Sequence, residues 1–214
     1  MKIKHVLICI VSCCFLLSAC SGAESDAPQN ITSEISAYAP HETVTYKGHD
    51  SQVIELDSFN GDFWVLHVVG NRNESYFGIW GYDKNNKETE LFVNTTDFYD
   101  GTTVDMAQAT TTLKVESSDN WTIEQISIGN LHSIEKGDQI DGRGDSVFFV
   151  YSYGDTATIS GNAEKSYFGV IAYGTDKNDL WVNTTDQCKK TVKITNDVYL
   201  LSILSEGNWR IKFD

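Results

Sequence analysis

The sequence contains few basic residues and no cluster of them. Its 214 residues include 16 lysines and arginines against 30 aspartates and glutamates, which gives a formal net charge of −14. Binding to nucleic acid depends on clustered positive charge that neutralises phosphates, so we expect no nucleic-acid partner. The same acidity opposes binding to anionic lipid headgroups. Any contact with a bilayer is therefore expected to come from an attached lipid.

Recognisable catalytic motifs are also missing. The sequence has no nucleophile elbow, no phosphate-binding glycine loop, no HExxH and no Cys-x-x-Cys pair. His41, His49, His67 and His132 are widely spaced, and no two of them have the spacing of metal ligands. This favours a protein that is not an enzyme and has no cofactor. A hydrolase or other envelope enzyme, built from scattered His and Asp residues such as His67 or His49, remains the alternative.

The N-terminus carries the clearest motif. Lys2 and Lys4 precede a short apolar stretch from Val6 to Leu17, which is too short to span a bilayer and is typical of a secretory signal. The stretch ends in Leu17-Ser18-Ala19-Cys20, which resembles the lipobox of bacterial lipoproteins. The resemblance implies cleavage after residues 1–19, lipidation of Cys20 and anchoring on the extracytoplasmic face of a membrane, at the cell surface or in the periplasm. An ordinary secretory signal with an incidental cysteine is the alternative.

Processing at this site would leave almost no cysteine. Cys9, Cys13 and Cys14 would leave with the signal and Cys20 would carry lipid, so only Cys188 remains. The mature chain then has no internal disulfide and depends on its apolar core for stability. We expect Cys188 to be a small buried side chain. Residues 20–42 are polar and form the expected flexible tether.

Beyond the tether the sequence repeats itself. Five segments return in the same order, at offsets that fall from 94 to 88. The matched pairs are Gly48–Val53 with Gly142–Val147, Gly70-Asn71 with Gly161-Asn162, Ser75–Gly78 with Ser166–Gly169, Leu91–Asp97 with Leu180–Asp186, and Asn120-Trp121 with Asn208-Trp209. We interpret this as a tandem duplication with units at residues 43–128 and 129–214. Gly129-Asn130 is too short a connection for free movement, so we expect the units to form a fixed pair.

Each unit is predicted to be an antiparallel β-sandwich of the jelly-roll or immunoglobulin-like kind, which makes the chain all-β. Short β-branched and aromatic segments alternate with turn dipeptides, and no helical period is sustained outside the signal. The turns are expected at Gly61-Asp62, Gly70-Asn71, Asp100-Gly101 and Asp119-Asn120. The strands expected in the first unit are Val53–Ser58, Phe63–Val69, Tyr76–Tyr82, Leu91–Thr95, Thr102–Met106, Thr111–Glu116 and Trp121–Ile126.

The order of these motifs resembles a small β-sandwich module of bacterial secreted and cell-surface proteins, whose activity is not established. The pattern is Gly-x-Gly-Asp-x-Val at Gly142–Val147, Leu-x-Val-Asn at Leu91–Asn94, Tyr-x-Gly-Thr at Tyr99–Thr102 and Trp-x-Ile at Trp121–Ile123. The resemblance covers residues 44–214. The second unit departs from it, with Cys188-Lys189-Lys190 in place of Tyr99-Asp100-Gly101. These are packing and turn motifs, so the resemblance implies a fold more than a function.

The repeated aromatics are expected in the cores, and the unshared aromatics are better candidates for binding. Trp121 and Trp209 are predicted to be the central core aromatic of each unit. Trp64, Trp80, Tyr99 and Trp181 are the candidate ligand-binding residues, for a protein or glycan ligand. The spacing of Asp138, Asp141 and Asp145 indicates a candidate Ca²⁺ site, although exposed acidic turns explain it as well. Arg143-Gly144-Asp145 spells an adhesive tripeptide, but it coincides with the Gly-x-Gly-Asp turn of the module.

The sequence thus predicts a lipid-anchored, non-catalytic surface protein that presents two sandwiches to a ligand. An envelope enzyme and a structural envelope lipoprotein are the alternatives.

Overall fold

The burial of side chains alternates strictly along several strands of this protein, and β8 is an example. In the computed structural model, β8 (Asn120–Ser127) buries every second residue, including Trp121 and Ile123, and β17 (Asn208–Phe213) does the same. Such alternation arises when one face of a strand meets a core and the other does not. The structure describes residues 41–151, 154–175, 177–194 and 198–214, all within one compact unit of the chain. Cys20 and most of the expected tether lie outside these residues.

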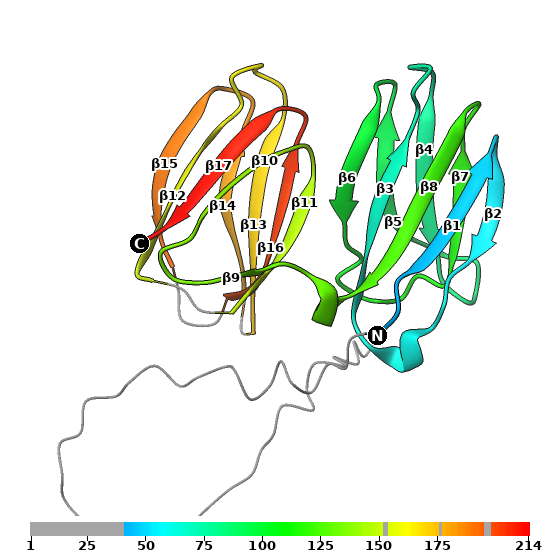
Figure 1. Cartoon of the computed structure of the whole chain (residues 1–214), viewed down its shortest axis with the longest axis horizontal. Coiled ribbons are helices and arrows are strands. Elements are labelled where there is room, and N and C mark those ends of the chain that lie inside the picture. Colours follow the sequence, from blue (N-terminus) through cyan, green and yellow to red (C-terminus); the bar gives the residue numbers. More distant parts are fainter. Residues whose placement is uncertain (1–40, 152–153, 176, 195–197) are drawn as a thin grey trace, which may run out of the picture. The chain divides into compact units, whose positions relative to one another are not determined.

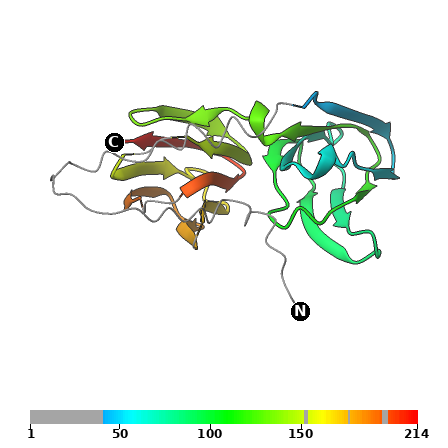
Figure 2. The same cartoon turned by 90° about the horizontal axis from the view of Figure 1, so that it is seen from below.

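The described residues are all-β, and their sheets are antiparallel apart from one short pair (Figures 1 and 2). Among them there is no α-helix, and so none that is long and apolar enough to cross a membrane. Two short 3₁₀ turns, η2 (Phe59–Gly61) and η3 (Ile128–Asn130), join strands. The other strands of residues 41–127 are β1 (Val44–His49), β2 (Gln52–Glu55), β3 (Trp64–Gly70), β4 (Phe77–Tyr82), β5 (Glu88–Thr95), β6 (Tyr99–Thr103) and β7 (Thr112–Glu116).

The second half repeats the strand order of the first. Sheets β1-β8-β3-β6 and β2-β7-β4-β5 correspond to β10-β17-β12-β15 and β11-β16-β13-β14, and β9 adds a parallel edge to the last of these. The two halves therefore share one strand order. The remaining strands are β9 (Ser133–Ile134), β10 (Gln139–Arg143), β11 (Ser146–Val150), β12 (Thr156–Gly161), β13 (Phe168–Gly174), β14 (Asn178–Thr184), β15 (Cys188–Lys193) and β16 (Val198–Ser205).

A tryptophan lies at the same core position in each half. Trp121 and Trp209 are 2% and 3% exposed, which confirms the prediction that both are core residues. Each indole Nε1 donates a hydrogen bond of 2.9 Å to a backbone oxygen, of Asp50 and Gly144 respectively. The paired residues across the ladder are Gly48 and Gly142, and a Cβ at either position would overlap the indole ring. Glycine is required there because the ring lies flat against the neighbouring strand.

A buried asparagine closes the same turn in each half. Asn71 and Asn162 are fully buried with positive φ angles of 62° and 61°. The Asn71 side-chain amide donates to the backbone oxygens of Ser75 and Asp97, and Asn162 makes the equivalent pair of hydrogen bonds. Asparagine tolerates the left-handed region better than most residues, and these bonds satisfy its buried amide. The asparagine of each expected Gly-Asn turn therefore also hydrogen-bonds its own turn to a second loop, at Asp97 in the first half and Asp186 in the second.

Three details differ from the expected strands. Val44–His49 forms β1, which was not among the expected strands. The expected strand Thr102–Met106 is instead β6, Tyr99–Thr103, so Asp100-Gly101 lies inside a strand and not in a turn. A Cβ on Gly101 would lie 3.1 Å from Asp145 Cβ, so this glycine serves a close approach between segments.

Three apolar clusters hold the sheets together. One contains Leu66, Val68, Phe77, Ile79 and Trp121, which come from both sheets of the first half, and a second draws in the same way on both sheets of the second half. The third joins the halves, through Phe63, Val65, Ile128, Val147, Phe149 and Leu200. Val65 is fully buried although its neighbour Leu66 points to the first core, so the opposite face of β3 is covered by this third cluster.

Candidate functional site

The four candidate aromatics do not come together. Trp64 and Trp181 are each 4% exposed and belong to the apolar clusters of their halves. The Trp181 Nε1 has no hydrogen-bond partner among the described residues. Tyr99 lies between the halves, and its hydroxyl donates a 2.8 Å hydrogen bond to Asp145 Oδ2. Only Trp80 lies on an outer sheet face.

Trp80 lies in a row of outward side chains that crosses all four strands of sheet β2-β7-β4-β5, with Lys114 between Val53 and Trp80. The register pairs Val53 with Lys114, Lys114 with Trp80, and Trp80 with Leu91, so these residues share one face. Val53 is 70% exposed and Leu91 44%. Tyr76, also 44% exposed, has its ring centroid 6.3 Å from that of Trp80. We call these five residues the Trp80 surface.

The geometry around the indole keeps it flat on the sheet. A Cβ on Gly78 would overlap the far edge of the Trp80 ring and approach the Tyr76 hydroxyl to 2.9 Å. The Lys114 Nζ lies 5.4 Å from the Trp80 ring centroid, within cation–π range, and 2.6 Å from Glu116 Oε1. Hydrogen bonding to Glu116 raises the pKa of Lys114, so this ammonium stays charged. The Trp80 surface thus combines an aromatic plane with charged groups at its border.

The carboxylate of the adhesive tripeptide is engaged within the protein, although Arg143 is exposed. The Asp145 carboxylate accepts hydrogen bonds from the Tyr99 hydroxyl and from the Ser205 backbone N–H at 2.8 Å each. Burial raises the pKa of Asp145 despite these hydrogen bonds, and burial beside that carboxylate raises the pKa of Tyr99. Asp145 therefore joins the two halves of the chain.

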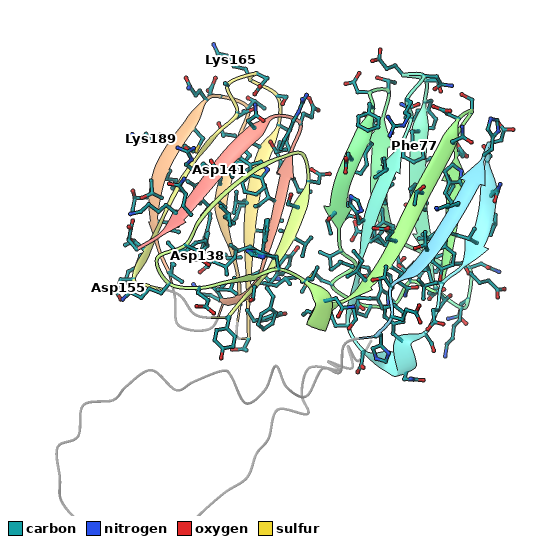
Figure 3. All side chains as sticks on the ribbon, in the orientation of Figure 1. Phe77, Asp138, Asp141, Asp155, Lys165 and Lys189 are labelled. Atoms are coloured by element: carbon teal, nitrogen blue, oxygen red, sulfur yellow. The ribbon has the colours of Figure 1, made fainter. Side chains whose placement is uncertain are left out.

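The three aspartates of the candidate Ca²⁺ site have separate partners. Asp141 pairs with Arg210, Asp138 accepts from the Glu135 backbone N–H at 2.8 Å, and Asp145 is held as described above. Figure 3 shows Asp138 in the turn before β10 and Asp141 further along that strand. Within the described ranges, no three His, Cys, Asp or Glu side chains form a group that could hold a metal ion. The structure thus does not bring these carboxylates together.

His67 is the histidine that gathers carboxylates. It lies on the face of β3 opposite the first core, with Nδ1 3.1 Å from Glu124 Oε2 and Nε2 3.0 Å from Asp100 Oδ1. Burial by itself lowers the pKa of His67, but hydrogen bonds to Glu124 and Asp100 and their charge outweigh this effect and raise it. Both ring nitrogens are engaged, so neither is free to activate a nucleophile. The sequence identified His67 as a candidate but could not place its two partners.

We expect the His67 imidazole to titrate above the ordinary histidine value of about 6.5. The Asp100→Asn, Glu124→Gln double variant should bring its midpoint down, because both carboxylates would be neutral. Since the folded-state pKa is raised, the contribution of His67 to stability is fully present below about 6.5 and disappears as the pH rises through the folded pKa. NMR titration of the ring protons measures the midpoint, and an unchanged midpoint in the double variant would contradict this assignment.

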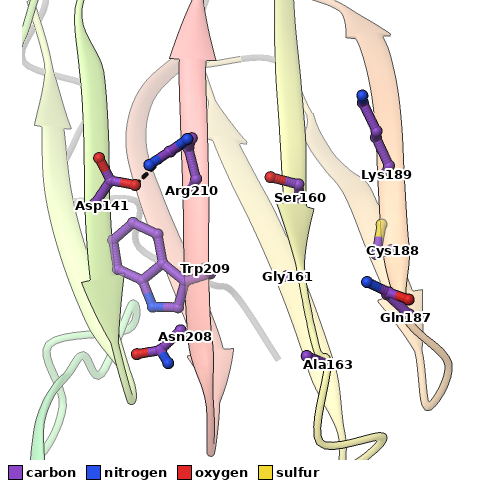
Figure 4. Close-up of a pocket in the computed structure, with 10 residues that line it drawn as sticks. All are labelled: Asp141, Ser160, Gly161, Ala163, Gln187, Cys188, Lys189, Asn208, Trp209 and Arg210. Carbon is purple, nitrogen blue, oxygen red and sulfur yellow. Dashed lines mark hydrogen bonds and ion pairs between the residues drawn. The ribbon is translucent and has the colours of Figure 1, made fainter.

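The second half carries a groove of about 600 Å³ on the outer face of sheet β10-β17-β12-β15. Asp141, Ser160, Lys189, Asn208 and Arg210 are among the residues that line it (Figure 4). Cys188 also borders the groove and is half-buried rather than buried as expected. Burial raises the pKa of its thiol, although Lys190 acts in the opposite direction. A thiol with a raised pKa is a poor nucleophile near neutral pH.

Comparisons with known proteins give no relative. No protein-family model and no curated protein match the chain. Of the solved structures, YhaK from Escherichia coli is similar over 82% of this chain and 85% of its own, at 7% identity and a TM-score of 0.24. The structure of Sulfolobus turreted icosahedral virus is similar over 81% of this chain and 90% of its own, at 6% identity and a TM-score of 0.23. Neither similarity is close enough to support an argument.

Proposed function

We propose that this protein is a lipid-anchored bacterial surface lipoprotein without catalytic activity, which binds the carbohydrate part of a ligand on its Trp80 surface. The Trp80 surface is the observation that carries the proposal. Trp80 has two strongly exposed hydrophobic neighbours there, Tyr76 and Leu91, and a third, Val53, lies beyond Lys114 in the same row. Contiguous exposed apolar groups of this kind mark binding surfaces.

A carbohydrate fits this surface for chemical reasons. One face of a pyranose ring is a plane of C–H groups, which packs on an aromatic ring, while its hydroxyls need polar partners nearby. The Trp80 ring supplies the plane, and the Tyr76 hydroxyl and the Lys114–Glu116 pair supply donors and acceptors at its border. A protein ligand that inserts an apolar side chain between Val53 and Leu91 is the second possibility.

We further propose that the two halves are separate antiparallel sandwich domains of the jelly-roll or immunoglobulin-like kind. Each half has its own pair of sheets in the same strand order and its own apolar cluster. The third cluster and the Tyr99–Asp145 hydrogen bond would then fix the domains as a pair. The lipobox and the tether would present this pair at a membrane surface.

The envelope enzyme is the other candidate because His67 contacts two carboxylates. His67 is half-buried in that cluster, and both imidazole nitrogens are engaged by Asp100 and Glu124. A general base needs one free ring nitrogen beside its substrate. The arrangement therefore favours an ion-pair cluster over a catalytic group. A structural envelope lipoprotein would leave the Trp80 surface without a ligand.

Replacing Trp80 with alanine should weaken glycan binding at least tenfold, because an aromatic contact of about 1.4 kcal/mol corresponds to a factor of ten in affinity. The measurement is a glycan array followed by calorimetry with neutral glycans, using the chain from Ser21, which retains every described residue. Ile171→Ala is the matched control, since Ile171 pairs with Leu180 as Trp80 pairs with Leu91. An unaltered affinity in Trp80→Ala with a folded protein would refute the proposed site.

A further inference from the structure

Positive charge is concentrated on one sheet face of this acidic chain. Across β10-β17-β12-β15, the outward positions carry five basic residues and two acidic residues. The register places Lys189 opposite Ser160 and Lys193 opposite Thr156, on the face away from the buried Ala157 and Ile159. The five are Arg143, Lys189, Lys193, Arg210 and Lys212, and we call them the basic face; the two acidic residues are Asp141 and Asp214. The whole chain has 16 basic residues against 30 acidic residues.

Most of this charge is not neutralised within the protein. Arg210 pairs with Asp141 and Lys212 with Asp214. Arg143, Lys189 and Lys193 form no ion pair with any carboxylate among the described residues. Exposed cations that lack internal partners are available to an anionic ligand.

The groove lies within this face and adds neutral polar groups between the cations. Figure 4 shows Arg210, Ser160 and Lys189 on three neighbouring strands, and the register places them in one row with Asp141. Asn208 and Gln187 contribute side-chain amides to the lining. The groove thus presents the guanidinium group of Arg210, the ammonium group of Lys189 and the hydroxyl group of Ser160, together with the two amides. Such a row suits a ligand that carries both anionic groups and hydroxyls.

The first half does not have this face. Because Gly48 pairs with Trp121 as Gly142 pairs with Trp209, the residues equivalent to Arg210 and Lys212 are Thr122 and Glu124. The residue equivalent to Lys189 is Asp100. Two basic positions of the second half thus correspond to the carboxylates that hold His67. The charge is a property of one half and not of the shared fold.

We propose that the basic face binds an anionic polysaccharide, whose carboxylate, phosphate or sulfate groups pair with Lys189, Lys193 and Arg143. A nucleic acid is disfavoured because the residues that the structure describes place no exposed aromatic side chain on this face to stack with bases. An anionic bilayer is disfavoured because the rest of the chain is strongly acidic and would be repelled. A polysaccharide chain can contact the face while the remainder of the ligand stays away from the acidic surface. This site is separate from the Trp80 surface and does not depend on it.

The test is binding of the chain from Ser21 to heparin and to polygalacturonate, with neutral dextran for comparison. The Lys189→Gln, Lys193→Gln double variant should bind at least one of the two anionic polymers about tenfold more weakly, because it loses two charge-assisted contacts. Lys47→Gln, which removes an exposed lysine from the corresponding face of the first half, should leave the affinity unchanged. Binding should weaken as salt is raised from about 50 mM to about 500 mM.

Heparin and polygalacturonate separate sulfate from carboxylate recognition, and either is consistent with the proposal. Equal affinity in the double variant, or no binding to either polymer at low salt, would overturn it. The assignment to a polysaccharide would be overturned if the protein bound double-stranded DNA or phosphatidylglycerol vesicles more tightly than either polymer and the double variant lost that binding. Trp80→Ala should leave this binding intact, so the two proposed sites succeed or fail separately.

Discussion

Trp209→Ala is expected to lower the free energy of unfolding of the second half by about 3–5 kcal/mol, the usual cost of emptying a large core site. The indole is 3% exposed, packs among the apolar residues of both sheets and donates a hydrogen bond to Gly144. Small domains have total stabilities of about 5–15 kcal/mol, so this loss is enough to unfold the half that carries it. Trp121→Ala should act in the same way on the first half. Urea denaturation followed by far-UV circular dichroism measures both effects.

Gly142→Ala tests the same packing from the opposite side. The added methyl would overlap the Trp209 ring, so we expect a destabilisation of about 1–3 kcal/mol from overpacking. Gly137→Ala is a contrasting control, because nothing lies within 4 Å of the position of its added Cβ, although its φ of 89° strains any side chain. Trp209→Ala that leaves stability unchanged while abolishing ligand binding would show that Trp209 belongs to a binding surface.

Cys20→Ser should release the protein from the membrane fraction almost completely. The expected lipid on Cys20 is the only membrane attachment that we infer from the sequence, since the chain is acidic. Fractionation with immunoblotting measures the distribution, and metabolic labelling with palmitate reports lipidation directly. Ala19→Gly, which keeps a lipobox residue of the same class, is the matched control and should remain in the membrane. Retention of Cys20→Ser in the pellet at high salt would rule out anchoring through Cys20.

Much of the fold could be predicted because the residues that pack in the core and form the turns occur twice in the sequence, in the same order. Trp121 and Trp209 recur with the same neighbours, and their strands alternate with a period of two, so both core positions were predictable. The turn at Asp100-Gly101 was wrong for a physical reason. Glycine is needed where a backbone turns and where two segments approach closely, and sequence alone does not separate these two uses.

The candidate surfaces were harder to predict because they depend on register across strands. Trp80 was a candidate, but Val53 joins it through pairings between strands that are distant in the sequence, and Leu91 joins it through a local pairing whose register shifts between Ile79 and Trp80. The same limit applies to the basic face. Its five cations come from three strands, β10, β15 and β17, and the sequence shows only an acidic chain without a basic run. Tyr99 was predicted as a ligand contact, but it bonds Asp145 of the other half instead.

The strand order leaves β15 and β5 at sheet edges, where unpaired backbone groups could recruit a strand from another molecule. Both edges are charged: β15 carries Lys189, Lys190 and Lys193, and β5 carries Glu88 and Glu90. A chain held in the plane of a membrane meets copies of itself far more often than a freely diffusing one. Two lysine-rich edges repel each other, as do two glutamate-bearing edges, so like strands resist stacking into aggregates. The same lysines that give β15 its charge thus oppose pairing of this edge with the β15 edge of another copy.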